Sequence, residues 1–301
     1  MFKKNLKKII PPFTLNFLKK IKYQIDFLPF SKTVFNNQQF RNKHKGERCF
    51  ILGSGPSVSL EDLTPLRDEA LIALNSFYVH HDYKKIFNDQ KSKYHLIGPL
   101  SDPISEENWR EWFMEIQSNI PNSVKIFFGL NNRKPSSKEI IDKHEIFKDR
   151  NINWFFSTKN KDDEELTSSD IDFSKNILSS STSAIWALQL AIYMGFKEIY
   201  LIGMDHNYIA LKKTKQRFAF SGYLHLLEKK HSDISLVSKN SLSFSYSANT
   251  ESLFHTAKIF MHYKKLDNLF DGKIYNTSKD SFLDIFEYIS LEEVLKKNEV
   301  S

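Results

Sequence analysis

Residues 48 to 57 read Arg48-Cys49-Phe50-Ile51-Leu52-Gly53-Ser54-Gly55-Pro56-Ser57. The apolar run is typical of a buried β-strand, and the glycines, proline and serine indicate a turn at its end. Such a turn exposes backbone N–H groups to which an anion can bind, although two glycines also occur in ordinary tight turns. Val58 stands where a dinucleotide-binding motif has its third glycine, and no Gly-Lys-Ser/Thr sequence follows. Because neither nucleotide motif is complete, the stretch favours a site for another phosphorylated ligand.

The rest of the chain alternates short apolar runs with helical patterns. Strands are expected at residues 49–52, 70–74, 94–97, 124–128, 199–202 and 273–275. This alternation predicts an α/β fold that is doubly wound around a mostly parallel sheet. The polar residues 157–174 predict a mobile loop, and the weakly periodic residues 212–247 predict a lid-like or acceptor-binding insertion at about 209–248.

Two four-residue sequences resemble capping boxes, in which a serine and a later acidic residue close the start of a helix. The first, Ser59-Leu60-Glu61-Asp62, follows the glycine turn. The second, Ser290-Leu291-Glu292-Glu293, lies near the end of the sequence. We therefore expect a helix to begin at each.

A second informative stretch covers residues 179–208. It begins with hydroxyl residues, continues as an apolar helix that Gly195 ends, and then enters the strand at 199–202. Hydroxyl groups at a helix start satisfy its free N–H groups or donate to an anion. Gly203, Asp205, His206 and Tyr208 follow the strand, at the edge where open α/β sheets bind ligands. The stretch predicts a second anion-binding position beside a polar strand end.

The composition bounds the class of protein. With 301 residues and 41% hydrophobic content, the chain is long enough for one catalytic domain with appendages. Its single cysteine, Cys49, excludes a disulfide framework and a multi-cysteine metal site, and a packed thiol is compatible with a reducing cytoplasm. The net charge of +7 favours an anionic partner, but the lysines are spread along the chain without a nucleic-acid motif. We therefore expect no nucleic acid partner.

Residues 1–45 are expected to form a basic amphipathic unit, followed by a catalytic domain at 46–301. Apolar residues recur at helical spacing at Phe13, Phe17, Ile21 and Ile25, among lysines. Such a helix can lie on an anionic membrane surface, and it can equally pack against the catalytic domain or a second subunit of a homo-oligomer. We find no secretory signal and no run of about 18 apolar residues. The expected location is cytoplasmic, and peripheral on the inner membrane if the helix binds lipid.

Four features of the sequence resemble one family. They are the turn at 53–57, Asn75 at the end of the second strand, Thr182-Ser183 before the apolar helix, and the run Gly195-Phe196-Lys197-Glu198-Ile199-Tyr200-Leu201-Ile202-Gly203-Met204-Asp205. Together they resemble the small bacterial CMP-sialic acid sialyltransferases that act on lipooligosaccharide. They are also similar to the wider group of flagellin nonulosonate transferases and 6-hydroxymethylpterin pyrophosphokinase-like proteins. The resemblance covers residues 45–75 and 179–208, with weaker similarity at 247–251 and 273–276.

The resemblance implies a Rossmann-like fold and an inverting glycosyltransferase. Such an enzyme moves a sialic acid-like sugar, a nonulosonic acid, from CMP to a surface polysaccharide or lipooligosaccharide acceptor, without a metal or other cofactor. Hydroxyl and N–H donors can stabilise a leaving phosphate in place of a cation. Carried over by position, the donor-binding residues are Gly53, Ser54, Gly55, Pro56 and Ser57 at the phosphate, Asn75 at the cytidine or ribose, Ser181, Thr182 and Ser183 at cytidine or donor groups, Asp205 as a residue that shapes the site, and Asn207 or Tyr208 at the departing phosphate.

The sequence Asp170-Ile171-Asp172 has the letters of the cation-binding motif that many nucleotide-sugar transferases carry. Because it lies in the polar stretch 157–174 and not at an expected strand end, we interpret it as a coincidence. No metal ligands are therefore expected.

The general base is where the chain departs from the family. Tyr246 occupies the position of the family's histidine, and a tyrosine with an ordinary pKa is a poor base near neutral pH. We expect His206 to serve instead, because it adjoins Asp205 at the functional edge of the sheet. Two histidines of the expected insertion are alternatives, and two on a helix expected at 251–263 are interpreted as surface or packing residues. These are, in that order, His225, His231, His255 and His262.

Two other functions stay open. A magnesium-dependent pyrophosphokinase of the 6-hydroxymethylpterin type would share the glycine turn and the strand end at 203–205. It would need carboxylates to hold its metal, and it would leave the basic N-terminal segment without a purpose. A catalytically inactive nucleotide-binding subunit of a glycan assembly complex would explain why the family's histidine is missing.

Overall fold

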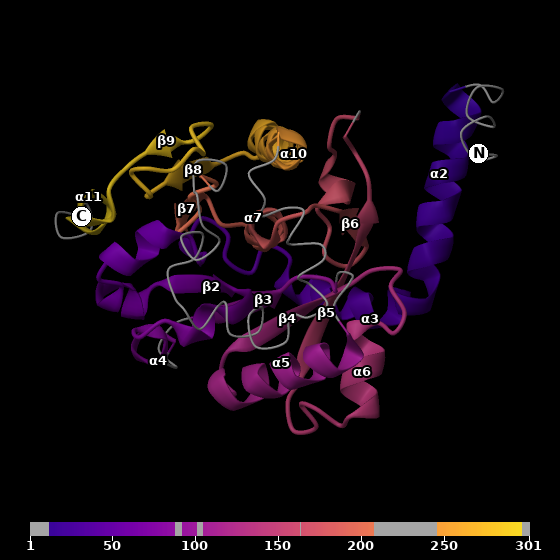
Figure 1. Cartoon of the computed structure of the whole chain (residues 1–301), viewed down its shortest axis with the longest axis horizontal. Helices are drawn as coiled ribbons and strands as arrows, with labels where there is room; N and C mark the ends of the chain where they lie inside the picture. The colour runs from indigo at the N-terminus through magenta and orange to yellow at the C-terminus, as the bar shows by residue number, and fades with distance from the viewer. Residues whose placement is uncertain (1–11, 88–91, 101–104, 163, 208–245, 297–301) are drawn as a thin grey trace.

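The computed structural model describes residues 12–87, 92–100, 105–162, 164–207 and 246–296. These residues form one sheet of nine strands with helices on both of its faces (Figure 1). From edge to edge the strand order is β6-β5-β4-β3-β2-β1-β7-β8-β9, and every pair of neighbours is parallel. The prediction of a doubly wound α/β fold is confirmed.

The strands are short and follow the expected positions closely, with three additions, β5, β6 and β9. They are β1 (Arg48–Leu52), β2 (Ala70–Leu74), β3 (Lys93–Ile97), β4 (Lys125–Leu130), β5 (Ile152–Lys159), β6 (Asn176–Leu178), β7 (Glu198–Ile202), β8 (Lys273–Asn276) and β9 (Glu287–Tyr288). The α-helices of the described residues are α2 (Pro12–Phe27), α3 (Ser31–Phe35), α4 (Tyr83–Ile86), α5 (Glu106–Asn119), α6 (Ser137–Lys143), α7 (Ser183–Met194), α10 (Tyr246–Leu269) and α11 (Leu291–Lys296).

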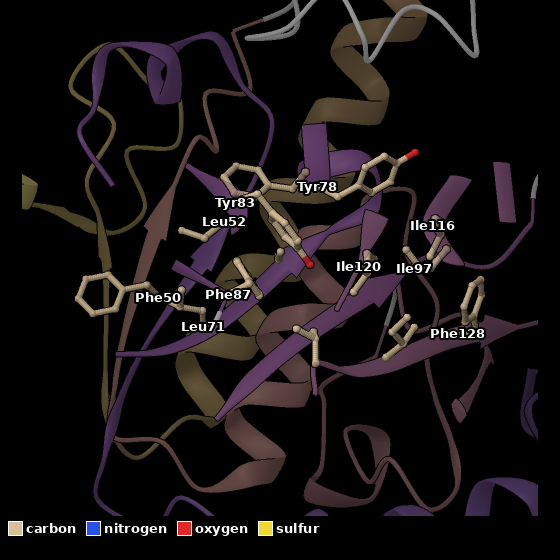
Figure 2. Packing of buried hydrophobic residues seen from close by; sticks show 14 of the residues in the cluster. Phe50, Leu52, Leu71, Tyr78, Tyr83, Phe87, Ile97, Ile116, Ile120 and Phe128 are labelled. Atoms are coloured by element: carbon tan, nitrogen blue, oxygen red, sulfur yellow. The ribbon is translucent and has the colours of Figure 1, made fainter. Parts of the chain in front are cut away.

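The central strands are buried on both faces, which explains why they read as unbroken apolar runs. Successive side chains of a strand point to opposite faces, so Phe50 and Leu52 of β1 enter one core while Cys49 and Ile51 enter the other. The first core packs against α4, α5 and α6, and Figure 2 shows part of it from close by. The second core packs against α7 and α10, on the opposite side of the sheet (Figure 1).

The chain turns back across the sheet between β6 and β7. It runs outward from β1 to the edge strand β6, and α7 then leads it to β7, which pairs with the free side of β1. Helix α7 lies over β1, β2 and β3. Gly195 ends α7 with φ +86°, a left-handed conformation that favours glycine, as the sequence predicts. The reversal of direction at β1 and β7 is the topological switch point, where open α/β sheets bind ligands beyond the carboxyl ends of the strands.

The polar residues 157–174 form a loop only in part: residues 160–162 and 164–167 have neither helix nor strand, as the sequence predicts. Ser157 to Lys159 complete β5, and Asp170 and Asp172 are buried. Their polar groups are satisfied inside the protein: Asp170 accepts a hydrogen bond from the backbone of Thr167 and pairs with Lys159. Buried hydrogen bonds and ion pairs therefore hold the second part of this polar stretch, which its composition alone does not indicate.

The two expected capping boxes have different outcomes. Ser290 and Glu293 bond each other reciprocally at the start of α11, as predicted. Ser59 begins no α-helix, because the chain there forms two short 3-10 helices, η3 (Pro56–Leu60) and η4 (Thr64–Asp68). The hydroxyl of Ser59 donates back into η3, and Asp62 accepts from the backbone of Thr64 instead.

The N-terminal segment divides near residue 30. Helix α2 lies at the edge of the molecule beside β5 and β6 (Figure 1), whereas Val34, Asn37 and Phe40 are buried in the α/β domain. Asn37 Nδ2 donates to the backbone oxygens of Trp154 and Phe173, which fixes this stretch to the sheet. Residues 34–40 therefore pack with the α/β domain, and the boundary that the sequence places at residue 45 stays a prediction. Among the described helices, none has the length and apolarity needed to cross a membrane.

Candidate functional site

A cavity of about 1180 Å³ follows the carboxyl ends of the strands at the switch point. It extends from the end of β7 past β1, β2, β3 and β4 to β5, and it reaches the N-terminus of α7. Neutral polar side chains and three tryptophans dominate its described lining, in which Asp205 and Arg133 are the carboxylate and the basic side chain. A largely preformed concave pocket with a few polar groups is typical of small-molecule sites.

Residues that the sequence proposes for the site converge on this cavity, although they are far apart along the chain. They come from the ends of β1, β2 and β7 and from the start of α7. The lining includes Gly53, Ser54, Gly55, Pro56, Asn75, Ser181, Thr182, Ser183, Asp205, His206 and Asn207.

Three proposed residues do not join that set. Ser57 is not part of the lining. Tyr208 lies outside the described residues, as does the expected insertion at about 209–248, apart from the first turn of α10. Tyr246 is the first residue of α10, and its backbone alone is described.

Gly53 and Gly55 allow the ends of β1 and β7 to touch. Their N–H groups donate to the carbonyls of Ile202 and Gly203, each at 2.8 Å. A Cβ atom at Gly53 would lie 2.7 Å from the Gly203 oxygen, and one at Gly55 would overlap Oδ2 of Asp205. Both positions therefore require glycine because two segments of the protein approach each other closely.

The turn offers fewer N–H groups to an anion than the sequence predicts. Besides the two glycines, Ser57 donates its N–H to Asp205 Oδ2 and Val58 donates to Gly55. Pro56 has no N–H group. Among the described hydrogen bonds, Ser54 is the residue of the turn whose N–H and hydroxyl are not used. The expected cradle of several N–H groups is wrong, and Ser54 is the residue that can bind a ligand in this way.

Asp205 is a buried carboxylate that holds the turn in place. Its Oδ2 accepts the Ser57 N–H at 3.1 Å, and its own carbonyl accepts the N–H of Phe282 at 2.8 Å. Burial raises the pKa of Asp205, and the hydrogen bonds from Ser57 oppose that rise. Ser57 Oγ donates to Ser278 Oγ, which in turn accepts the N–H of Gly203. Ser57 therefore acts by fixing the end of β7 and not by lining the cavity.

Asn75 joins the end of β2 to the start of α7. Its Nδ2 donates to Ser183 Oγ at 2.5 Å, and its Oδ1 accepts the Gly98 N–H at 3.2 Å. Asn75 has φ +48°, and His95 Nε2 bonds its carbonyl at 2.5 Å. A non-glycine residue held in this conformation is uncommon and is found preferentially at ligand sites.

The N-terminus of α7 opens into the cavity. Ser181, Thr182 and Ser183 line the wall there, and the N-cap residue, Thr182, makes no side-chain capping bond. Helix starts carry N–H groups without intrahelical acceptors and a partial positive charge, which together favour a bound anion. This end of the cavity therefore suits a phosphate better than the glycine turn does.

His206 is not placed as a general base. It is 7% exposed, its Nε2 lies 2.9 Å from the Tyr263 hydroxyl, and its ring packs edge-on against Phe260. Burial lowers the pKa of His206 to about 4, so the ring is a weak base at neutral pH. His206 connects the end of β7 to α10, and its role as the base stays a prediction that this burial does not favour.

The sequence assigns His262 to packing. In the structure it pairs with a carboxylate and lies next to a residue of the cavity lining. Its Nε2 lies 3.2 Å from Asp162 Oδ1, and its Nδ1 lies 3.5 Å from Oγ of Ser180, a lining residue. Burial lowers the pKa of His262, and Asp162 opposes that decrease. Lys258 also pairs with Asp162, at 2.8 Å. A carboxylate, a histidine and a hydroxyl in a row can relay a proton.

The Asp170-Ile171-Asp172 sequence has no part in the cavity. Asp170 pairs with Lys159, and Asp172 pairs with Arg41 at 2.5 Å. Neither carboxylate belongs to the described lining. Both carboxylates are held in ion pairs within the protein, and the interpretation of the sequence as a coincidence stays a prediction.

The described lining is a poor fit for a divalent cation. Its one carboxylate, Asp205, already accepts a backbone N–H, whereas magnesium sites rely on carboxylate oxygens that face the ion. Elsewhere in the described residues, His80, His81 and Asp82 form one cluster of metal-ligand types. That cluster lies outside the cavity lining, and Asp82 pairs with Lys85 at 2.8 Å.

Comparison with known proteins leaves the family open. No family model matches the sequence, and neither the curated proteins nor the solved structures gave a match. A functional assignment therefore rests on the geometry and the residues of the cavity.

Proposed function

We propose that this protein is an inverting glycosyltransferase that moves a sialic acid-like sugar from CMP to a glycan or glycolipid acceptor. One observation carries the proposal: the turn at 53–57, Asn75, the start of α7 and Asp205 all meet at one cavity. These are the features that resemble the CMP-sialic acid sialyltransferases, and they lie up to 152 residues apart in the sequence, from Gly53 to Asp205. The carboxyl ends of parallel strands meet at one edge of any such sheet, so the support lies in the residue types that meet there.

The size and lining of the cavity suit a nucleotide-sugar. Strands in a sheet are about 4.8 Å apart, so roughly 14 Å separates β1 from β4, where Arg133 lines the wall. A nucleotide at the switch point could therefore extend its sugar toward β4. Trp109, Trp112 and Trp186 in the lining offer apolar faces to sugar or base rings.

The proposed chemistry needs no metal. CMP becomes a good leaving group when donors stabilise the charge that develops on its phosphate. The N–H groups at the start of α7, the hydroxyls of Thr182 and Ser183, and Ser54 are the donors that the cavity provides. The acceptor oxygen would attack the anomeric carbon from the opposite side as CMP leaves, which inverts the configuration.

The acceptor must lose a proton as it attacks. We assign this step to Ser180 Oγ, which passes the proton to His262 Nδ1 while Asp162 stabilises the imidazolium. In this assignment Ser180 touches the substrate, and His262 and Asp162 act through it. The proposal also implies a cytoplasmic enzyme at the inner membrane, where lipid-linked acceptors would be available.

Calorimetric titration with CMP, CDP, UDP and ATP, each with EDTA and again with magnesium, tests the proposal. We expect metal-independent binding that is selective for CMP. Ser54→Leu should weaken it by about tenfold or more, because the added side chain enters the cavity. Ser59→Leu is the matched control, because Ser59 is exposed in η3, the 3-10 helix that follows the turn.

Other outcomes would replace the proposal. Magnesium-dependent binding of ATP would indicate the pyrophosphokinase, and absence of any nucleotide binding would indicate an inactive subunit. Equal losses in the two serine variants would show that the turn, and not the cavity, had been damaged.

A further inference from the structure

Helix α2 has two faces with different surroundings. One face attaches to the domain: the Tyr23 hydroxyl bonds the backbone of Asn160, and Phe27 packs on the ring of Phe156 at 5.8 Å. Asp26 on the same face accepts a hydrogen bond from Asn132. These contacts hold α2 against the edge of the molecule that Figure 1 shows at the right.

The other face of α2 is apolar and exposed. Phe17 is 56% exposed, Leu18 48%, Ile21 39% and Ile25 62%, and Leu28 just beyond the helix is 67% exposed. At about 3.6 residues per turn, the four helical residues fall within an arc of about 100°, opposite the attached face. Large apolar side chains gathered in one stripe, here called the α2 stripe, are a feature of interaction surfaces.

Positive charge flanks the α2 stripe. At about 3.6 residues per turn, the exposed Lys20 and Lys22 flank the stripe on its two sides, and Lys22 also pairs with Asp26 at 2.5 Å. Lys19 lies toward the attached face, where it and Lys20 interact with the charge of Glu164. Residues 1–35 contain eight lysines, one aspartate and no arginine or glutamate. Their net charge of +7 equals that of the whole chain, so residues 36–301 are neutral overall. Lysines occur throughout the sequence, but the excess of basic over acidic residues is confined to residues 1–35.

We propose that the α2 stripe is a membrane-binding surface for anionic lipid, in which the apolar side chains enter the interface and the lysines contact the headgroups. An amphipathic helix with lysines beside its apolar face binds membranes in this way. A second copy of the chain fits less well, because a symmetric contact would bring two strongly positive segments together. The inference deepens the proposed function by naming the surface that brings the enzyme to a lipid-linked acceptor.

Sedimentation of the full-length protein with vesicles tests the surface. The probes are vesicles of neutral phosphatidylcholine and vesicles that also contain phosphatidylglycerol. We expect binding to the anionic vesicles that weakens steeply as salt is added. The double variant Ile21→Glu with Ile25→Glu should weaken this binding by tenfold or more, because two carboxylates would enter the interface.

The matched control is Met114→Glu with Met261→Glu. These methionines are 50% and 42% exposed on α5 and α10, so the control makes the same change in charge at helical surfaces away from α2. Its binding to anionic vesicles should stay within about twofold of the wild type.

Three results would overturn the inference: no binding to anionic vesicles, equal loss in both double variants, or a stable dimer that Ile21→Glu with Ile25→Glu dissociates. Titration of the same variants with CMP separates the two proposals. Lipid binding without CMP binding would support the membrane-binding surface and contradict the proposed transferase. CMP binding without lipid binding would contradict the membrane-binding surface and support the transferase.

Discussion

Helices α2 and α7 carry their apolar residues in opposite arrangements. Helix α7 is apolar on nearly all sides, is buried over the centre of the sheet, and presents its polar start to the cavity. Helix α2 is attached along one face only and leaves its apolar stripe exposed. A helix that is apolar all round belongs inside a protein, whereas an amphipathic helix with its apolar face outward needs a partner. The region around α7, here called the packed end, therefore serves the core of the protein, whereas the region around α2, here called the exposed end, presents an apolar surface to a partner.

The largest effect is expected at the packed end, for Gly55→Val. A valine Cβ would overlap Asp205 and approach the carbonyl of Gly203, so the ends of β1 and β7 would have to separate. We expect a loss of about 4 kcal/mol or more in the free energy of unfolding, measured by thermal or denaturant unfolding. Ser54→Val is the control at the neighbouring position, because serine already has a Cβ atom.

The alternative outcome for Gly55→Val is informative. If this variant unfolds like the wild type and loses only nucleotide affinity, the glycine serves the ligand and not the contact between the strands. The packing argument for the switch point would then be wrong.

Much of the packed end could be predicted from the sequence because its signals are local. The strand at 49–52, the helix that begins near Ser183 and the left-handed Gly195 each follow from neighbouring residues. The reason for Gly55 could not be predicted, since the atom that excludes a side chain there belongs to Asp205, at the end of a strand that is distant in sequence. The sequence indicates the glycine correctly and gives the wrong physical reason for it.

The general base shows the same limit. His206 adjoins Asp205 in the sequence, which suggests a joint role, yet a φ of +48° and the contact with Tyr263 turn it into a structural residue. His262 gives no local signal, because its partner Asp162 lies 100 residues earlier. Asp162 lies in a turn after β5, in the polar stretch that the sequence predicts as a loop. Partners of this kind are set by the tertiary fold, and no spacing rule along the chain records them.

An intermediate effect is expected where α10 meets the start of α7. His262→Gln should lower kcat of the proposed transfer by about 100-fold while CMP affinity is unchanged, because loss of a base affects the chemical step. His255→Gln is the matched control on the exposed surface of the same helix. If instead His206→Ala abolishes turnover in a folded protein that still binds CMP, the base is His206.

The pH profile separates a proton relay from a structural clamp. His262 must be neutral to accept a proton, so activity is present above its pKa and is lost as pH falls through it. Burial lowers that pKa from the ordinary 6.5, which places the acid limb of kcat/KM below pH 6.5. Asp162→Asn removes a charge that raises the pKa of His262, and we expect the limb to move to still lower pH. If the acid limb of the pH profile does not move, His262 and Asp162 have only a structural role.

The smallest effect is expected on the stability of the exposed end. Ile25→Glu should change the free energy of unfolding by no more than about 0.5 kcal/mol, because Ile25 is 62% exposed and buries little area on folding. Leu190→Glu in α7, where the side chain is fully buried, should prevent folding and gives the scale of the comparison. If Ile25→Glu costs about as much as a core substitution, the α2 stripe is covered by protein in solution. If Ile25→Glu leaves the free energy of unfolding nearly unchanged and yet lowers vesicle binding, the apolar residues of the α2 stripe serve an external partner and not the fold.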